Sequence, residues 1–343
     1  MANRRGMDLR SIEKKVVEWL QWGKGAPNED LMAEIVQSVL KLARDEASRG
    51  DLKILSRSLK ELRYAFKIFA PYRSVRKVSI FGSTRVKEDD PYYRAAATLG
   101  HRLADEGLMV ITGAGTGIMQ AGNEGAGRGR SFGVNILLPF GQKANRFIRD
   151  DRKLVTFHFF FTRKLIFVKE TDAMVFFPGG FGTHDEAWEA LTLAQTGKSQ
   201  IIPFLFVDLP GQGYWRDWEN FVRKRMLHQG FISEQDMSLY KIVEDVELAV
   251  QEIKNFYRNY HSYRFVNRHL VIRMVHPPTD ELIQRLNSDF KDILTEGEIK
   301  KTDPLPDESD DPDTLQLPRL LVPFSLSDYG RLRQMIDVIN AQP

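Results

Sequence analysis

Apolar residues near the amino terminus recur three or four positions apart. The repeat runs from Ile12 to Phe69 and includes Leu31, Ile35, Val39, Leu52, Leu55, Leu59, Leu62 and Phe66. Residues at this spacing lie on one face of an α-helix. We therefore predict three helices before Pro71, in an amino-terminal helical segment that covers residues 1–72.

After Pro71 the pattern changes to short apolar runs separated by stretches of helical character. The runs are VSIFG (78–82), LMVIT (108–112), GVNILLP (133–139), AMVFFP (173–178) and IIPFLFVD (201–208). Runs that are apolar throughout are typical of strands buried on both faces, and their alternation with helices indicates a parallel sheet. We predict a doubly wound, Rossmann-like α/β domain over residues 73–258, closed by helices at 215–257.

A third segment begins near Tyr263. It contains predicted strands at 270–275, near 298–300 and at 317–324, predicted helices at 279–294 and 328–340, and an acidic, proline-rich stretch at 303–313 that reads as a loop. We expect residues 263–343 to form a small separate α+β module, with a ferredoxin-like arrangement as the suggested form. We expect it to contribute contacts or bind an effector rather than supply catalytic groups.

Composition excludes several classes of protein. The chain has 343 residues, of which 42% are hydrophobic and 28% charged, so collagen-like and wholly disordered chains are excluded. It has no run of about 18 apolar residues and no apolar stretch after its basic start, so we expect a cytoplasmic protein without a membrane span. Without cysteine, disulfides and thiolate chemistry are excluded. The net charge of +3, from 49 basic and 46 acidic residues, is too balanced to indicate nucleic-acid binding.

Three glycine-rich loops follow predicted strands, at 82–84, 113–117 and 178–183. In an open parallel sheet such loops line the ligand crevice, and glycines let backbone N–H groups approach an anion. We therefore predict a nucleotide or phosphate site at these loops. Its predicted binding residues are Gly82, Ser83, Gly115, Thr116, Gly117, Gly179, Gly180, Gly182 and Thr183. The loops lack the dinucleotide fingerprint and the lysine of a P-loop, which disfavours hydride transfer and NTP hydrolysis.

Charged residues accompany the third loop. Thr183 and Glu186 have the spacing of a helix capping box, in which Glu186 would only bind a backbone N–H. In the alternative interpretation, Glu186 and Glu189 share a helix face and engage hydroxyl groups or a cation. Arg163 and Lys164 supply positive charge nearby, with a plain solvated helix start as the alternative explanation of this pair. The histidines show no metal-ligand spacing, so we expect neither a metal nor a cofactor.

Three stretches resemble one family. TGAGTGIMQAGNEGAGRG (112–129), FFFTRK (159–164) and PGGFGTHDEAWEALTLAQTGK (178–198) resemble the LONELY GUY (LOG) family, phosphoribohydrolases that release cytokinin bases from nucleoside 5′-monophosphates and are often labelled lysine decarboxylase-like. The resemblance covers about residues 74–230. It implies that Arg163 and Glu186 are catalytic and that the glycine and threonine loops hold the phosphate. His184 and Asp185 depart from the residues that many members carry.

The expected reaction is hydrolysis of the N-glycosidic bond to free base and ribose 5-phosphate. An ionised Glu186 would stabilise an oxocarbenium-like transition state, Arg163 would assist, and Glu189 would hold ribose hydroxyls. A pyridoxal-phosphate decarboxylase is rejected, because no motif supports the lysine and acid that it needs. The alternative is a non-catalytic nucleotide-binding regulator of the same fold. From the apolar amino-terminal helices and from the resemblance, we expect a homodimer or larger homo-oligomer.

Overall fold

A computed structural model describes residues 14, 18, 28–139 and 143–342. The chain divides into two units, residues 1–60 and residues 61–343. The first unit contains α2 (Glu29–Arg44) and most of α3 (Arg49–Phe69). Acidic residues begin α2 and basic residues end it, which suits the helix dipole. The first of the three predicted helices falls largely outside the described residues.

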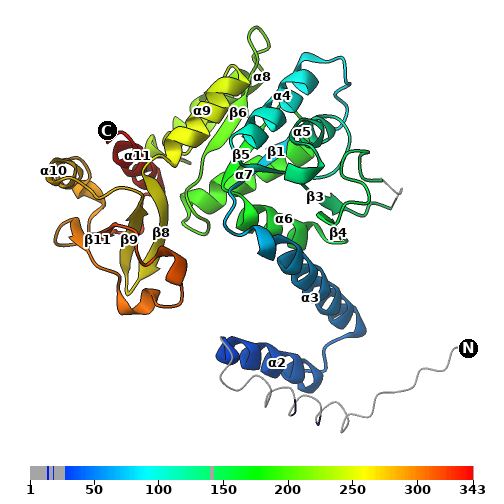
Figure 1. The fold of residues 1–343 in the computed structure, drawn as a ribbon, viewed down its shortest axis with the longest axis horizontal. Coiled ribbons are helices and arrows are strands. Elements are labelled where there is room, and N and C mark those ends of the chain that lie inside the picture. The colour runs from blue at the N-terminus through cyan, green and yellow to red at the C-terminus, as the bar shows by residue number, and fades with distance from the viewer. Residues whose placement is uncertain (1–13, 15–17, 19–27, 140–142, 343) are drawn as a thin grey trace, which may run out of the picture. The chain divides into compact units, whose positions relative to one another are not determined.

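The second unit is built on a seven-stranded parallel sheet with strand order β4-β3-β2-β1-β5-β6-β7 (Figure 1). The strands are β1 (Lys77–Phe81), β2 (Met109–Thr112), β3 (Ser131–Ile136), β4 (Leu154–Phe157), β5 (Ala173–Phe176), β6 (Phe204–Val207) and β7 (Tyr240–Val243). The predicted doubly wound α/β fold is therefore confirmed. The five predicted strands are β1, β2, β3, β5 and β6, whereas the two edge strands were not predicted, and β7 lies where only helices were expected.

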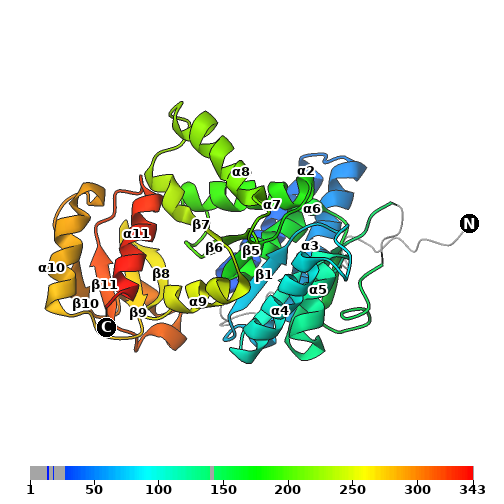
Figure 2. The same ribbon diagram turned by 90° about the horizontal axis from the view of Figure 1, so that it is seen from above.

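Helices cover both faces of this sheet because side chains alternate along each strand. Val78 and Ile80 pack toward α4 (Pro91–Asp105), α5 (Ile118–Ala126) and α9 (Val246–Phe256). Phe81 and Phe176 pack on the opposite face, with α6 (Phe160–Glu170), α7 (Phe181–Gln195) and α8 (Tyr214–Phe221). Figure 2 shows α4, α5 and α9 on one side of the sheet and α6 and α7 on the other.

Short helical turns connect these elements. They are η1 (Ala70–Tyr72), η2 (Arg128–Arg130), the π-helix η3 (Val222–Leu227) and η4 (Gln235–Leu239) in the α/β part, and η5 (Lys291–Ile293), η6 (Pro306–Glu308) and η7 (Pro312–Thr314) near the carboxyl terminus. Asp90 caps α4, with Oδ1 accepting the N–H of Tyr92 at 2.8 Å and Pro91 in the first turn.

The chain reverses its direction of sheet growth between β1 and β5. It first builds β2, β3 and β4 on one side of β1, and then returns to place β5 on the other side. The loops that follow β1 and β5 therefore diverge at neighbouring strand ends. Open α/β sheets bind ligands in the crevice at such a reversal.

The carboxyl-terminal segment forms a four-stranded antiparallel sheet of order β10-β11-β9-β8 with two helices (Figure 1). Its elements are β8 (Tyr260–Val266), β9 (His269–Met274), α10 (Asp280–Asp289), β10 (Lys300–Thr302), β11 (Arg319–Val322) and α11 (Tyr329–Asn340). Their order is hairpin, helix, hairpin, helix, whereas a ferredoxin-like unit runs strand, helix, strand, strand, helix, strand. β8 begins at Tyr260, three residues before the predicted start of this segment near Tyr263.

This carboxyl-terminal sheet shares a hydrophobic core with the parallel sheet. Phe176 and Phe204 belong to the same cluster of buried residues as Ile272 and Ile336. Polar contacts add to the junction, because Arg333 Nη2 in α11 donates to Glu252 Oε1 in α9 at 2.9 Å. The domain boundaries 1–72, 73–258 and 263–343 stay predictions.

Candidate functional site

A cavity of about 820 Å³ lies at the carboxyl ends of the parallel strands, at the reversal between β1 and β5. Its walls include the loops that follow β1, β3 and β5, Gly113 after β2, and the first turns of α6 and α7. The lining residues include Phe81, Gly82, Ser83, Thr84, Arg85, Gly113, Met119, Asn135, Ile136, Leu138, Phe160, Arg163, Gly179, Gly180, Phe181, Gly182, Thr183, His184, Asp185, Glu186 and Tyr214. This volume suits a ligand of nucleotide size.

Glu186 lines this cavity from the second turn of α7. Only 9% of its surface is exposed, and among the described residues its carboxylate has neither a hydrogen bond nor an ion pair. Burial raises the pKa of Glu186 to about 7, although the charges of Arg163 and Lys164 oppose this shift. The site therefore holds a carboxyl group that titrates near neutral pH.

The capping-box interpretation of Glu186 does not hold. α7 begins at Phe181, with Gly180 in the N-cap position and no side chain capping it. Thr183 therefore lies within the first turn, and Glu186 lies too far along the helix to reach the terminal N–H groups.

Arg163 faces the cavity from the first turn of α6. Its Nε donates to the carbonyl of Val134 at 2.9 Å, and burial lowers the pKa of its guanidinium. Space is tight here, because a Cβ added at Gly113 would lie 2.3 Å from Nη2 of Arg163. A glycine at position 113 therefore leaves room for the arginine.

Glu61, near the end of α3, fixes the start of α6. Its carboxylate accepts the N–H of His158 at 2.9 Å and the hydroxyl of Thr162 at 2.7 Å. Because α6 carries Arg163, a residue of the predicted amino-terminal segment helps to position the cavity.

Lys164 lies beside Arg163 in the chain but does not line the cavity. Its Nζ lies 2.7 Å from an oxygen of Asp185 and 2.6 Å from an oxygen of Glu189. Glu189 is therefore paired with Lys164 and lies outside the lining residues. Its predicted contact with ribose hydroxyls stays a prediction.

The first and third glycine loops line the cavity together. The N–H of Ser83 donates to the carbonyl of Pro178 at 3.0 Å. A Cβ at Gly179 would lie 2.1 Å from Oγ1 of Thr183, so the third loop folds tightly against the start of α7. These contacts bring together Gly82, Ser83, Gly179, Gly180, Gly182 and Thr183 at one cavity, and their predicted role in binding the substrate stays a prediction.

The second glycine loop reaches the cavity only through Gly113, and its other residues support the first loop from outside the lining. Thr116 donates its hydroxyl to the carbonyl of Thr84 at 2.9 Å, and the Asn145 amide donates to the carbonyl of Gly115 at 3.0 Å. Gly117 has φ +65°, and a Cβ there would lie 2.2 Å from the carbonyl oxygen of Ser83. The predicted phosphate contacts of Gly115, Thr116 and Gly117 stay predictions.

Sequence reasoning missed an aromatic part of the wall. His184 Nε2 lies 2.7 Å from the Tyr214 hydroxyl, which donates to the carbonyl of Gly179. Asp208 holds the start of α8 by accepting the N–H groups of Tyr214 and Trp215, each at 3.0 Å. The sequence signal that could have indicated this part of the wall is Asp208, an acidic residue at the end of the apolar run IIPFLFVD.

The edge of the cavity is apolar and exposed. Phe160 lines the cavity from α6, and Phe181, at the start of α7, is 98% exposed. Phe161 and Leu165 continue this exposed apolar surface along α6. An apolar surface of this kind beside a cavity marks a place for a ligand or a partner chain.

The described part of the chain contains no group of three or more acidic or histidine side chains placed to hold a metal ion. None of its helices has the length and apolar character that a membrane crossing requires.

The fold and the position of the cavity define a Rossmann-like domain with a ligand-sized crevice at its switch point. Residues 116–253 match the family model described as "Possible lysine decarboxylase". A relative from Oryza sativa subsp. japonica, "Probable cytokinin riboside 5′-monophosphate phosphoribohydrolase LOGL5", is 30% identical over 165 residues. That match covers 46% of this chain and 63% of the relative, so the chain spans less than two thirds of its length.

A second relative, "Cytokinin riboside 5′-monophosphate phosphoribohydrolase LOG3" of Arabidopsis thaliana, is 28% identical over 46% of this chain and 72% of its own length. These matches confirm the resemblance to the LOG family, at modest identity.

Two solved structures share part of the arrangement. TM1055, a structural-genomics target, is 22% identical and aligns over 52% of this chain and 99% of its own with a TM-score of 0.39. The molybdenum cofactor carrier protein from Chlamydomonas reinhardtii is 17% identical and aligns over 52% and 96% with a TM-score of 0.38. Neither likeness bears on what this chain binds.

Proposed function

We propose that this protein is a hydrolase that cleaves the N-glycosidic bond of a nucleoside 5′-monophosphate and releases the base and ribose 5-phosphate. The observation that carries the proposal is the buried carboxyl group of Glu186, which has no partner among the described residues and lines one cavity with Arg163 and two glycine loops. The relatives named as phosphoribohydrolases support the same reaction.

Glu186 acts in its ionised form. Breaking an N-glycosidic bond builds positive charge on the ribose, and a carboxylate in a partly dehydrated cavity stabilises that charge strongly. The carboxylate also orients the attacking water. Arg163, which is held by the Val134 carbonyl, assists by hydrogen bonding to the leaving base or to the phosphate.

The phosphate binds at the start of α7. The first N–H groups of a helix have no partner within the helix, and the helix dipole favours an anion there. Gly180 and Gly182 leave open space at this turn, because a Cβ on either would meet no atom within 4 Å. Arg85, exposed on the loop after β1, adds a cation on the same cavity. Binding of the phosphate fixes the ribose against Glu186.

Chromatography after incubation with a panel of nucleoside 5′-monophosphates tests the reaction. We expect free base and ribose 5-phosphate, with the corresponding nucleosides cleaved roughly 10²-fold more slowly because they lack the phosphate. Arg163→Ala should lower kcat/KM far more than Lys164→Ala, because Lys164 is occupied by Asp185 and Glu189. Saturable binding of monophosphates without cleavage would contradict the proposal and favour the nucleotide-binding regulator.

We also propose that the chain acts as a cytoplasmic homodimer or larger homo-oligomer. The exposed apolar residues Phe160, Phe161, Leu165 and Phe181 give a surface beside the cavity that a second copy would cover. Light scattering of the full chain and of Phe161→Ser tests this. We expect a dimer or larger for the full chain and a smaller species for the variant, and a monomeric full chain would contradict the proposal.

A further inference from the structure

A second, larger cavity lies at the opposite edge of the parallel sheet. Its volume is about 1170 Å³. One wall consists of residues that precede β1, β5 and β6, and the other consists of β8 and residues 310–314. The amino ends of parallel strands lie opposite their carboxyl ends, so the sheet separates this cavity from the candidate functional site.

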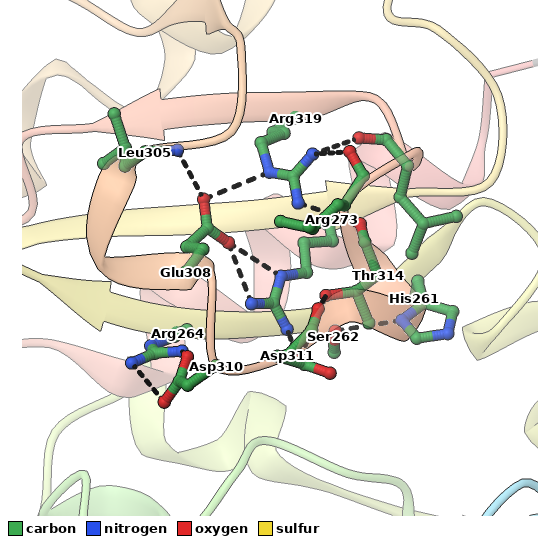
Figure 3. A network of polar contacts seen from close by, with 12 residues as sticks. His261, Ser262, Arg264, Arg273, Leu305, Glu308, Asp310, Asp311, Thr314 and Arg319 are labelled. Atoms are coloured by element: carbon green, nitrogen blue, oxygen red, sulfur yellow. Dashed lines mark hydrogen bonds and ion pairs between the residues drawn. The ribbon is translucent and has the colours of Figure 1, made fainter. Parts of the chain in front are cut away.

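The wall that carries residues 310–314 is acidic and firmly anchored. Glu308 is fully buried between Arg273 and Arg319, with ion pairs of 2.8 and 3.2 Å (Figure 3). Although burial opposes ionisation, hydrogen bonds from Leu305 N–H and Arg273 hold the pKa of Glu308 below its ordinary value. This ionic triad keeps the acidic loop against the antiparallel sheet.

The anchored loop presents one uncompensated carboxylate to the cavity. Asp310 pairs with Arg264, and Asp311 pairs with Arg273 at 2.7 Å (Figure 3). Asp313 also lines the cavity, but its carboxylate has no partner among the described residues.

The facing wall is basic. Arg76 is neutralised by Asp172 at 3.2 Å and stacks on the ring of Tyr257 at 3.6 Å. Arg73 lines the same wall, is exposed, and has no side-chain partner within the described ranges. Lys169 adds a second cation, which pairs with Glu170 at 2.6 Å. The cavity therefore has an unpaired positive group on one wall and an unpaired negative group on the other.

Buried apolar and aromatic side chains lie between these walls. Met174 and Phe204 come from the parallel sheet, and Tyr260 comes from β8. Ligand cavities often occur where two layers of structure meet, and in this one polar and charged residues surround the apolar and aromatic side chains.

We propose that this cavity is a second binding site, for a nucleotide whose base carries an amino group. The phosphate lies toward Arg73 and Lys169, the ring lies against the aromatic lining, and the amino group donates to Asp313. An amino group suits an unpaired carboxylate because ionised carboxylates only accept hydrogen bonds. The site goes beyond the proposed function, since it uses neither Glu186 nor Arg163.

Isothermal titration calorimetry of the full chain tests the site with ATP, GTP and UTP as probes. Arg163→Ala serves as the background, so that binding at the candidate functional site is weakened. We expect ATP and GTP to bind this variant, and UTP, whose base has no amino group, to bind roughly tenfold more weakly. The added change Arg73→Ala should weaken ATP binding by about tenfold or more. Arg225→Ala, an exposed arginine outside the cavity, is the matched control and should leave it unchanged.

The change Asp313→Ala should remove the difference between ATP and UTP. The proposal is overturned if ATP does not bind the Arg163→Ala background, if Arg73→Ala and Arg225→Ala weaken binding equally, or if UTP binds as tightly as ATP. Calorimetry measures binding and not turnover, so the binding result can be interpreted even if the proposed hydrolysis is not observed.

Discussion

Glu186 combines a position in the candidate site with a cost in stability. Its pKa of about 7 means that the folded chain still binds a proton where an unfolded chain has released it. Stability therefore falls as pH rises from the ordinary glutamate pKa to about 7, because the folded state binds more protons across this window. A buried carboxyl group with a raised pKa in a cavity is a common feature of functional sites.

We predict that Glu186→Gln loses activity and gains stability. The kcat should fall by roughly 10²-fold or more, since the stabilising charge is removed. The free energy of unfolding should rise by on the order of 2 kcal/mol at about pH 8 and change little at about pH 5. Steady-state kinetics and denaturant unfolding at both pH values measure this, and a folded variant with normal turnover would show that Glu186 has no chemical role.

The pH dependence of kcat/KM gives a second prediction at this scale. In the proposed mechanism the ionised form of Glu186 acts, so kcat/KM should rise with pH and level off above about 7. His184 is the neighbouring group that titrates, and burial lowers its pKa. The acid limb should therefore persist in His184→Gln. Loss of the limb in that variant would assign it to the imidazole instead.

At the scale of elements, the sequence pattern predicted the strands that are buried on both faces of the sheet. The central strands β1, β2, β3, β5 and β6 are buried at every position and were found. The edge strands were missed because their burial is incomplete, as in β4, where Thr156 is exposed, and in β7, where Lys241 is exposed. The edge strands β4 and β7 have only four residues each, so the alternation of apolar and polar residues along them is too short to predict a strand.

The sequence predicted those residues of the candidate site that lie in a recognisable motif and themselves line the cavity. Arg163, Glu186 and two glycine loops follow from motif and strand order, and they line one cavity. The second loop could not be assigned, because its role depends on contacts with Ser83, Thr84 and Asn145, which are distant in sequence. Tyr214 likewise reaches the site through a turn set by Asp208.

Gly117 allows a prediction about how the two loops interlock. Gly117→Ala should destabilise the protein by roughly 3 kcal/mol or more, because an unfavourable φ is added to a clash with the Ser83 carbonyl. Gly127→Ala is the matched control, with φ +69° and no atom within 4 Å, and it should cost only about 1 kcal/mol. Thermal or denaturant unfolding compares the two, and equal losses would show that the Ser83 loop yields to the added methyl group.

For the whole molecule, the shared core predicts that residues 61–343 unfold together. Tryptophans at 188, 215 and 218 report on the α/β part, and none lies in residues 263–343. Glu308→Gln leaves two buried arginines without their carboxylate and should destabilise the fold by roughly 3 kcal/mol.

This loss should appear in the tryptophan fluorescence transition, although Glu308 lies in the other sheet. Asp310→Asn, in the exposed pair with Arg264, is the control and should shift the transition far less. A Glu308→Gln chain whose tryptophan transition is unchanged would show that the carboxyl-terminal sheet unfolds separately.

The two cavities at opposite edges of one sheet have a consequence for finding inhibitors. A compound in the crevice beside Glu186 and a compound in the cavity beside Arg73 would occupy different volumes, so neither would displace the other. A screen that scores competition with a monophosphate would therefore recover compounds from one edge only. Screening by thermal shift, with the crevice already filled, would select molecules for the other edge.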